Sequence, residues 1–516
     1  WPGNIKKLAI SITNGVATLV DADGNAAIDA STGKILDSAR TYWSAGSDGS
    51  KVKAGGVGAL LAARDPDTRV IKTNTGASGA LQDFNSTNIT AAAYGLAGLT
   101  QLLDLFGVSS QNELNDLLAW ARGFTDRTKT DTREWILGDM LHSRPLVLNY
   151  GARGTHTATD PDVRIVVGTN AGFLHMFDNG NGAENWAFFP KELAPVLEQR
   201  RANAANNQNV YGIDAPVAYY SKDLNKDGTI DSTAGDKLYI FFGLRRGGKA
   251  FYALDVSNPD SPAFLWKIDK GSSGFEELGQ SWSVPAVTYV PGYASSDVPK
   301  PVLIFGAGYD TAKDSKNTVA GADGEGRGVF IVDAQTGAKV WSVTPADNGT
   351  RNLQATGLQY SMPADVTVLD SNGDGLTDRI YAPDTGGNVW RVDLPGNALP
   401  GASQTTWRIT KLAALNTSAT DGHAGDRRFF SATDVVRARD STLGIFDAVM
   451  IGSGDRENPN ATDNVDRLYM LRDRQTGVYA TVAPTPQECT DGSTDHRCVL
   501  PITNADLYDA TLNLIQ

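Results

Sequence analysis

Arg164-Ile-Val-Val-Gly-Thr-Asn-Ala-Gly-Phe-Leu-His-Met-Phe-Asp178 is the stretch that decides the fold of this chain. It contains two short apolar runs around an Asn-Ala-Gly turn, and Trp186 follows in a third run. Short runs of β-branched and aromatic residues bounded by turn residues indicate β-strands. The stretch therefore predicts a hairpin whose second strand ends in an aspartate. His175 is expected to be a packed strand residue of this hairpin and not a metal ligand.

Comparable units recur to the end of the chain. An antiparallel unit of this kind cannot bury its apolar face alone, and radial stacking of several units solves that problem. The repeats therefore predict a mainly β chain with a β-propeller over residues 131–516. A bare four-stranded blade needs about 40 to 45 residues, so the wider spacing here indicates long insertions in some blades. The markers of the repeat are strand-ending aspartates 60 to 78 residues apart: Asp178, Asp255, Asp333 and Asp393.

Residues 1–130 lack this repeat and are expected to form a small mixed α/β segment with a pair of helices. Steps of three and four residues between apolar side chains are typical of one buried helical face, and Gly107 is expected to end the first helix. That first face would consist of Ala92, Leu96, Leu99, Leu103 and Phe106. The second helix is expected over residues 111–121, with an inner face of Leu114, Leu117, Leu118 and Ala121.

The composition of the 516 residues excludes two classes of function. The net charge is −13 and the chain has no long basic run, which argues against a nucleic-acid partner because such a partner requires neutralisation of phosphates. There is no run of 18 apolar residues, so no transmembrane helix is expected. The chain begins at Trp1 and has no initiator Met, and we expect it to be a fragment of a longer exported protein.

A candidate calcium loop runs from Asp223 to Asp231, with the sequence Asp-Leu-Asn-Lys-Asp-Gly-Thr-Ile-Asp. Oxygen ligands at positions 1, 3, 5, 7 and 9 around a turn glycine suit Ca²⁺, and Gly228 stands at position 6. An EF-hand would add Glu at position 12, where this chain has Ala234, so the loop would close through Asp231. A solvated acidic turn is the alternative. The predicted ligands are Asp223, Asn225, Asp227, the Thr229 carbonyl and Asp231.

The same spacing returns 147 positions later, in a second candidate loop from Asp370 to Asp378. The turn glycine is Gly375, and position 12 is Tyr381, again not acidic. A third segment, from Asp21 to Asp29, has Ala26 where the turn glycine belongs, and its interpretation stays open between a calcium loop and an acidic turn. The predicted ligands of the second loop are Asp370, Asn372, Asp374, the Leu376 carbonyl and Asp378.

The two cysteines of the chain, Cys489 and Cys498, lie near the C-terminus with eight residues between them. The polar loop between them suits a disulfide, and two isolated thiols are the alternative. A zinc site is not expected, because His496 alone cannot complete a four-ligand shell.

The sequence resembles the C-terminal propeller region of the PilY/PilC family, proteins associated with the tip of bacterial type IV pili. The order and spacing of five blocks carry this resemblance, which covers roughly residues 110–480. The blocks are Trp120-Ala-Arg-Gly-Phe124, Ile136-Leu-Gly-Asp-Met-Leu-His-Ser-Arg-Pro145, Val167-Gly-Thr-Asn-Ala-Gly-Phe-Leu-His-Met-Phe177, Phe188-Phe-Pro-Lys-Glu-Leu193 and the first calcium loop.

The resemblance implies a modified propeller with repeats like those of quinoprotein dehydrogenases, for which we expect seven blades. It also implies an exported protein at the cell surface, pilus tip or outer membrane, with roles in pilus biogenesis, twitching motility and adhesion. The implied partners are pilin or minor pilins, the pilus assembly machinery and host or abiotic surfaces. In that family calcium is thought to regulate whether the protein opposes pilus retraction, and the family ligands carry over to the loop from Asp223 to Asp231.

Three functions follow as hypotheses. The first is a non-enzymatic, calcium-dependent pilus biogenesis and adhesion protein. The second is a propeller scaffold in which calcium is purely structural, and the sequence alone does not separate these two. The third is a quinone-dependent dehydrogenase; against it, the tryptophans and aspartates lie at repeat positions where packing explains them, and the chain has no adjacent Cys pair.

Overall fold

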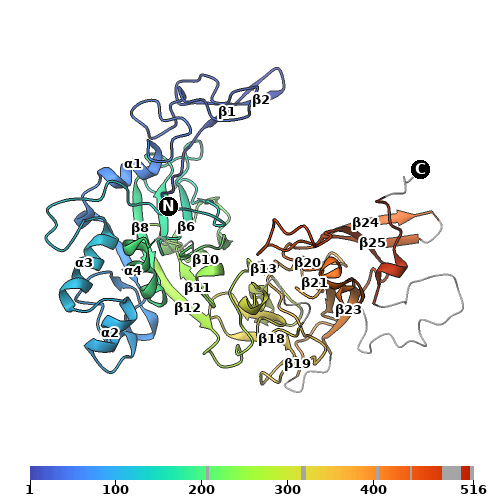
Figure 1. Cartoon of the computed structure of the whole chain (residues 1–516). Helices are drawn as coiled ribbons and strands as arrows, with labels where there is room; N and C mark the ends of the chain where they lie inside the picture. The colour runs from blue at the N-terminus through green and yellow to red at the C-terminus, as the bar shows by residue number, and fades with distance from the viewer. Residues whose placement is uncertain (205–208, 315–320, 402–405, 442–443, 479–500, 512–516) are drawn as a thin grey trace, which may run out of the picture. The chain divides into compact units, whose positions relative to one another are not determined.

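The computed structural model of the chain describes residues 1–204, 209–314, 321–401, 406–441, 444–478 and 501–511. The chain divides into two compact units, and we describe each by itself. Unit 1 comprises Trp1–Ile240 and Leu254–Leu265, and unit 2 comprises Phe241–Ala253 and Trp266–Gln516. Over the described residues taken together, strands outnumber helices (Figure 1), which confirms the expectation of a mainly β protein.

The stretch from Arg164 to Asp178 forms the predicted hairpin. Strand β6 (Val163–Gly168) pairs antiparallel with β7 (Leu174–Asp178), and Ile165 lies opposite Phe177. Gly172 in the turn has a φ of 92°, a left-handed conformation that favours glycine. Every residue of β7 up to Phe177 is buried, so both faces of this hairpin are covered.

Five sheets, each built on three or four antiparallel strands, follow one another along the described chain, and we number them as blades. Blade 1 comprises β5 (Leu146–Asn149), β6, β7 and β8 (Glu184–Phe189). Blade 2 comprises β9 (Val217–Lys222), β10 (Lys237–Gly243), β11 (Ala250–Asp255) and β12 (Ala263–Asp269). Blade 3 comprises β13 (Ala286–Thr288), β16 (Val302–Gly306), β17 (Val329–Asp333) and β18 (Lys339–Thr344), extended by the parallel strand β19 (Asn352–Gln354).

Blades 4 and 5 follow blade 3 along the described chain. Blade 4 comprises β20 (Thr367–Leu369), β21 (Arg379–Pro383), β22 (Asn388–Asp393) and β23 (Arg408–Ala414). Blade 5 comprises β24 (Asp434–Asp440), β25 (Gly444–Gly452) and β26 (Leu468–Asp473). Between the strands of blade 3 lies a small hairpin of β14 (Ala294–Ser295) and β15 (Val298–Pro299), and after blade 4 comes α5 (Ser418–Asp421).

Successive blades of unit 2 pack face to face. One buried cluster joins Ile331 and Trp341 of blade 3 to Ile380 and Val392 of blade 4, and a second joins blade 4 to blade 5. The rings of Trp341 and Trp407 meet edge to face, with centroids 5.6 Å apart. Four-stranded antiparallel sheets stacked through their faces are the blades of a β-propeller, as predicted. The described residues contain five blades, and the number seven stays a prediction.

The repeated tryptophans and aspartates have distinct roles in this stacking. The indole N–H of Trp186 in blade 1 donates to the Pro259 carbonyl of blade 2 at 2.9 Å, and that of Trp266 donates to the Ala334 carbonyl of blade 3 at 3.0 Å. Asp333, at the end of β17, accepts N–H groups from the turn that follows it. The tryptophan therefore fastens one blade to the next, and the aspartate shapes the turn inside a blade.

The segment before the propeller combines short strands and helices. Strand β3 (Ile71–Thr73) pairs parallel with β8 and so extends the sheet of blade 1, and β4 (Gln82–Asp83) pairs with β3. The domain boundary at residue 130 stays a prediction. The helices of this segment are α1 (Gly56–Ala63), α2 (Leu99–Phe106) and α3 (Gln111–Arg122), and α4 (Ala194–Ala202) follows blade 1.

The predicted helix pair is present, with one correction. Helix α3 buries the predicted inner face, and the Ser110 hydroxyl caps it by accepting the Glu113 N–H. The first helix begins only at Leu99, which is 47% exposed, and it buries Leu102 and Phe106. The predicted face beginning at Ala92 was therefore wrong, because Gly95 in a left-handed conformation separates a short 3₁₀ turn from the helix proper.

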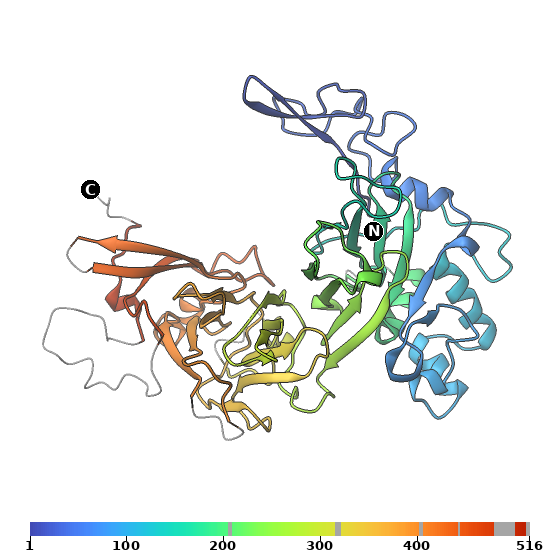
Figure 2. The same ribbon diagram turned by 180° about the vertical axis from the view of Figure 1, so that it is seen from behind.

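A two-stranded hairpin, β1 (Ala9–Thr13) and β2 (Val16–Val20), extends away from the rest of unit 1 (Figure 2). Ile10 lies opposite Leu19 and Ile12 lies opposite Ala17, so these four apolar side chains share one face of the ribbon. Ile10 and Ile12 are exposed. In the part of the chain that the structure describes, no helix is both long and apolar enough to cross a bilayer.

Candidate metal centres

Both candidate calcium loops lie at the same place within a blade. The loop from Asp223 to Asp231 (loop 1) joins β9 to β10, the first two strands of blade 2. The loop from Asp370 to Asp378 (loop 2) joins β20 to β21, the first two strands of blade 4. The predicted placement of both loops between the first two strands of a blade is confirmed.

Loop 1 is organised by side-chain oxygens that accept main-chain N–H groups from within the loop. Position 1 accepts from positions 4 and 6, position 3 accepts from position 5, and position 5 accepts from position 7. The bonds are Lys226 N to Asp223 Oδ1 (2.6 Å), Gly228 N to Asp223 Oδ2 (2.8 Å), Asp227 N to Asn225 Oδ1 (3.1 Å) and Thr229 N to Asp227 Oδ1 (2.7 Å).

Loop 2 repeats all four of these hydrogen bonds at the same positions. They are Gly373 N to Asp370 Oδ1 (2.6 Å), Gly375 N to Asp370 Oδ2 (2.7 Å), Asp374 N to Asn372 Oδ1 (2.9 Å) and Leu376 N to Asp374 Oδ1 (2.8 Å). The hydrogen bond from Gly375 and those from its neighbours lower the pKa of Asp370, so this carboxylate is held in its charged form.

The backbone conformations of the two loops also agree. Position 6 is left-handed in both, with φ of 82° at Gly228 and 86° at Gly375. Position 4 is left-handed as well, with φ of 60° at Lys226 and 82° at Gly373. A lysine rarely adopts this conformation, so the hydrogen bonds of loop 1 impose the same turn that glycine permits in loop 2.

Position 9 differs between the loops. The Asp231 carboxylate is exposed and turns away from the loop to accept the N–H and hydroxyl of Thr233, both at 2.8 Å, and these bonds lower the pKa of Asp231. The Asp378 carboxylate is buried and points back into its loop, where it accepts the N–H and hydroxyl of Ser371 at position 2.

Asp236 is a member of loop 1 that the spacing of the motif did not reveal. Its carboxylate is fully buried and accepts the N–H of Leu224, at position 2, at 2.8 Å and the N–H of Asp231 at 2.9 Å. Like Asp378, it directly precedes the second strand of its blade. Asp236 is thus the structural counterpart of Asp378. It lies 13 residues after position 1, where Asp378 lies eight residues after it, so loop 1 carries a five-residue insertion. An acidic residue immediately before a predicted strand was the signal for it.

The donor chemistry of both loops fits calcium. Each loop provides hard oxygen ligands of the kind that Ca²⁺ prefers, namely carboxylates, one amide oxygen and the main-chain carbonyl of position 7. Among the described residues, no three acidic, His or Cys side chains converge tightly enough to enclose a metal. Calcium coordination therefore needs the amide and main-chain oxygens. In loop 1 the Asp231 side chain must also rotate away from Thr233 to reach the ion.

The third acidic segment is neutralised from within the protein. The guanidinium of Arg40 binds both carboxylate oxygens of Asp23. The main-chain N–H of Arg40 donates to the Asp21 carboxylate at 3.2 Å. An arginine thus provides the positive charge that a calcium ion would otherwise supply. The structure favours the acidic-turn interpretation for this segment.

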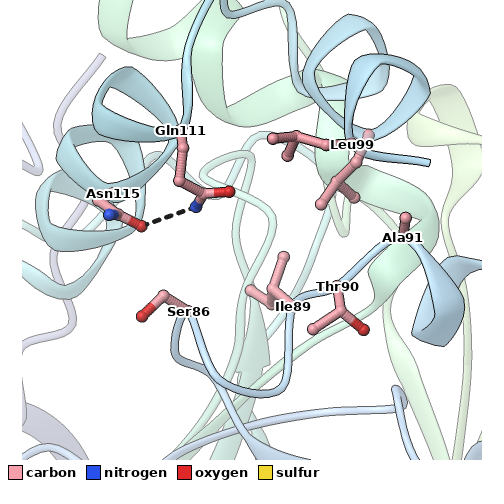
Figure 3. Close-up of a pocket in the computed structure, with 8 residues that line it drawn as sticks. Ser86, Ile89, Thr90, Ala91, Leu99, Gln111 and Asn115 are labelled. Carbon is pink, nitrogen blue, oxygen red and sulfur yellow. Dashed lines mark hydrogen bonds between the residues drawn. The ribbon is translucent and has the colours of Figure 1, made fainter.

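A pocket of about 460 Å³ in unit 1 lies between residues 86–91 and helices α2 and α3 (Figure 3). The Gln111 amide donates to the Asn115 side chain at 3.0 Å on one side, and Leu99 faces them from the other. Its lining residues include no acidic, basic or sulfur-containing side chain, so the pocket provides no charged ligand for a metal.

Two further predictions concern residues outside the loops. His175 is buried in β7 and its Nδ1 lies 2.8 Å from Glu184, which confirms it as a packed strand residue. Cys489 and Cys498 lie outside the described residues, so the predicted disulfide stays a prediction.

Comparison with known proteins gives consistent results. The family described as PilY1 beta-propeller domain matches residues 148–450, more than half of the chain. The type IV pilus biogenesis factor PilY1 of Pseudomonas aeruginosa (strain UCBPP-PA14) is 27% identical over 484 residues, which cover 84% of this chain and 37% of that protein. A PilY1 homolog of Xylella fastidiosa (strain Temecula1) is 27% identical over 432 residues, which cover 80% of this chain and 30% of that protein.

A solved structure is similar as well. The crystal structure of the Pseudomonas aeruginosa PilY1 C-terminal domain has a TM-score of 0.43 and 24% identity, and the match covers 61% of this chain and 58% of that chain. The chain spans only 37% and 30% of the lengths of the two relatives described above.

Proposed function

The chain belongs to the PilY1 β-propeller family, and from this premise we propose that it is the calcium-binding propeller of a type IV pilus biogenesis factor. The observation that carries the proposal is the duplicated loop: loops 1 and 2 share four hydrogen bonds and two left-handed positions although they lie in different blades. Two loops in different blades thus adopt the same turn, and each provides the kinds of oxygen ligand that Ca²⁺ prefers.

Calcium would act on these loops by neutralising clustered carboxylates. Asp223, Asp227 and Asp231 repel one another within nine residues, and the same holds for Asp370, Asp374 and Asp378. A cation that binds the folded loop and not the unfolded chain stabilises the folded loop. Extracellular or periplasmic calcium would then decide whether the loops are ordered, which is the chemistry of a switch.

In the cell, we place this switch in a non-enzymatic protein that is exported and acts at the cell surface or pilus tip. Its partners would be pilins, minor pilins and the pilus assembly machinery, and it would modulate pilus extension and retraction, twitching motility and adhesion. The naming of the relatives as type IV pilus biogenesis factors supports this role.

Titration calorimetry on the metal-stripped chain tests the calcium assignment. We expect two sites in the wild type, with one lost in Asp231→Ala and the other lost in Asp378→Ala. Asp23→Ala is the matched control, because it also removes an acidic side chain but from the segment that Arg40 neutralises. Absence of calcium binding in the wild type would refute the assignment.

Twitching assays separate a regulatory calcium from a structural one. A chromosomal double substitution of Asp231 and Asp378 by Ala, expressed at the wild-type level, should change the twitching zone and remove its dependence on external calcium. Unchanged motility in a strain whose purified protein no longer binds calcium would leave only the scaffold function. Absorbance of a bound quinone in the purified chain would instead favour a dehydrogenase.

A further inference from the structure

Both calcium loops touch the preceding blade through the same main-chain atom. The N–H of position 8 of loop 1, Ile230, donates to the Tyr150 carbonyl at 2.9 Å. The N–H of position 8 of loop 2, Thr377, donates to the Tyr289 carbonyl at 2.7 Å. Each of these contacts lies within a single unit of the chain.

The two acceptors are equivalent in the propeller. Tyr150 directly follows β5, the first strand of blade 1, and Tyr289 directly follows β13, the first strand of blade 3. Loop 1 belongs to blade 2 and loop 2 belongs to blade 4. Each loop therefore reaches back to the end of the first strand of the blade before its own.

Loop 1 packs closely against this acceptor. Ile230 is buried, and a Cβ on Gly151 would lie 2.1 Å from the Gly228 carbonyl oxygen and 2.8 Å from Thr229 Cα. Only a residue without a side chain lets the two backbones approach this far. The hydroxyl of Tyr150 donates to the Val256 carbonyl of blade 2 at 2.7 Å, which fixes the acceptor in turn.

Loop 2 contacts the preceding blade through a side-chain hydrogen bond in addition to the main-chain hydrogen bond. Thr377 is buried, and its hydroxyl lies 2.8 Å from the hydroxyl of Thr288, the last residue of β13. The position-8 residue is thus docked on the preceding blade in both loops, although one is isoleucine and the other is threonine.

We propose that the two loops are calcium-dependent clasps that fasten blade 2 to blade 1 and blade 4 to blade 3. This inference rests on the proposed calcium function. Position 8 lies between the carbonyl of position 7 and the carboxylate of position 9, so an ion that holds both neighbours fixes the direction of the position-8 N–H. Binding and docking are then coupled, and the coupling is reciprocal: loosening the blade contact must weaken calcium binding by the same factor.

A substitution outside the loop, which replaces no calcium ligand, tests this reciprocity. Gly151→Ala places a methyl group against positions 6 and 7 of loop 1. In an Asp378→Ala background, where loop 1 is the remaining calcium site, we expect calorimetry to show calcium binding weakened at least about fivefold, the lower end of typical coupling factors. Gly154→Ala is the matched control, because Gly154 is also left-handed and in the same connection, but a methyl group there would have no neighbour within 4 Å.

Hydrogen exchange on the unmutated chain provides an independent test that does not depend on folding of a variant. We expect calcium to slow exchange of the Ile230 and Thr377 amides at least about fivefold, whereas amides that exchange by local opening far from the loops in sequence, such as those of the exposed β1–β2 hairpin, stay unchanged. The clasp is refuted if the Asp378→Ala chain binds calcium and the added Gly151→Ala substitution does not weaken that binding. It is also refuted if calcium leaves the amides of both position-8 residues unprotected. In either case calcium binding itself stands. If the unmutated chain binds no calcium, the proposed function itself fails.

Discussion

At the scale of single residues, Asp236 shows how a buried carboxylate can support a metal loop without belonging to its motif. Its two oxygens hold the N–H groups of Leu224 and Asp231, and both groups would lose their partner in Asp236→Ala. A hydrogen bond to a charged group contributes about 1.5–3 kcal/mol. We expect this variant to lower the free energy of unfolding by at least about 1 kcal/mol in chelator and to weaken calcium binding at loop 1.

Asp231→Ala is the contrast for that experiment. Its carboxylate is exposed and bonded to Thr233 outside the loop, so its removal should abolish calcium binding at loop 1 with little change in stability in chelator. Urea unfolding and calorimetry measure the two effects separately. Equal stability losses in the two variants would contradict the role of Asp236.

A buried histidine makes unit 1 sensitive to acid. Burial lowers the pKa of His175, and its Nε2 has no hydrogen-bond partner among the described residues. Burial alone would raise the pKa of Glu184, but the Arg69 guanidinium and the bond from His175 hold it well below its ordinary value. Both groups resist protonation in the folded state, so the unfolded chain binds more protons in acid and stability falls as pH decreases.

The sign and the window of this effect can be measured. The contribution of His175 is present above its unfolded pKa of 6.5 and is lost as pH falls below that value, and that of Glu184 begins to be lost below about 4.5. We expect the unfolding free energy of unit 1 to fall by up to about 1.4 kcal/mol per pH unit per group. His175→Gln should flatten the slope between pH 6.5 and about 5.

At the scale of elements, the tryptophan on the outer strand is the fastening between blades. Trp266→Phe keeps an aromatic ring against Gly337 but removes the hydrogen bond to the buried Ala334 carbonyl. We expect a loss of about 1–3 kcal/mol in unfolding free energy, measured by denaturant titration followed by far-ultraviolet circular dichroism. Tyr508→Phe, which alters an exposed ring in the same unit, is expected to be neutral.

The sequence predicted the positions of the strands and loops better than the contacts between residues that are distant in sequence. Repeated apolar runs with terminal aspartates correctly indicated the hairpins and the positions of both loops, because strand periodicity is a local property. The blade contacts of Trp186 and the burial of Asp236 depend on residues that are distant in sequence or separated by an insertion. The first helix was predicted too long because Leu99 and Leu103 continue a helical spacing that Gly95 interrupts.

At the scale of the whole molecule, calcium should act as a stabilising ligand with a concentration-dependent effect. Binding to the folded state alone adds about 2.7 kcal/mol per site at a hundredfold excess over Kd. We expect excess calcium to raise the midpoint of thermal unfolding, less so in each single variant of Asp231 or Asp378, and not at all in the double variant. Magnesium at the same concentration should do less, because it demands a stricter octahedral shell than these loops offer.

The contact between each loop and the blade before it has a consequence for how sequences of this kind can diverge. Ile230 and Thr377 dock through main-chain atoms. Substitutions during evolution can therefore change the side chain at position 8 while the contact persists. Selection would instead act on the site that receives the loop, where Gly151 tolerates no side chain. Divergent relatives of this chain should therefore be recognisable by a glycine about 70 residues before loop 1, even where the residue at position 8 has changed.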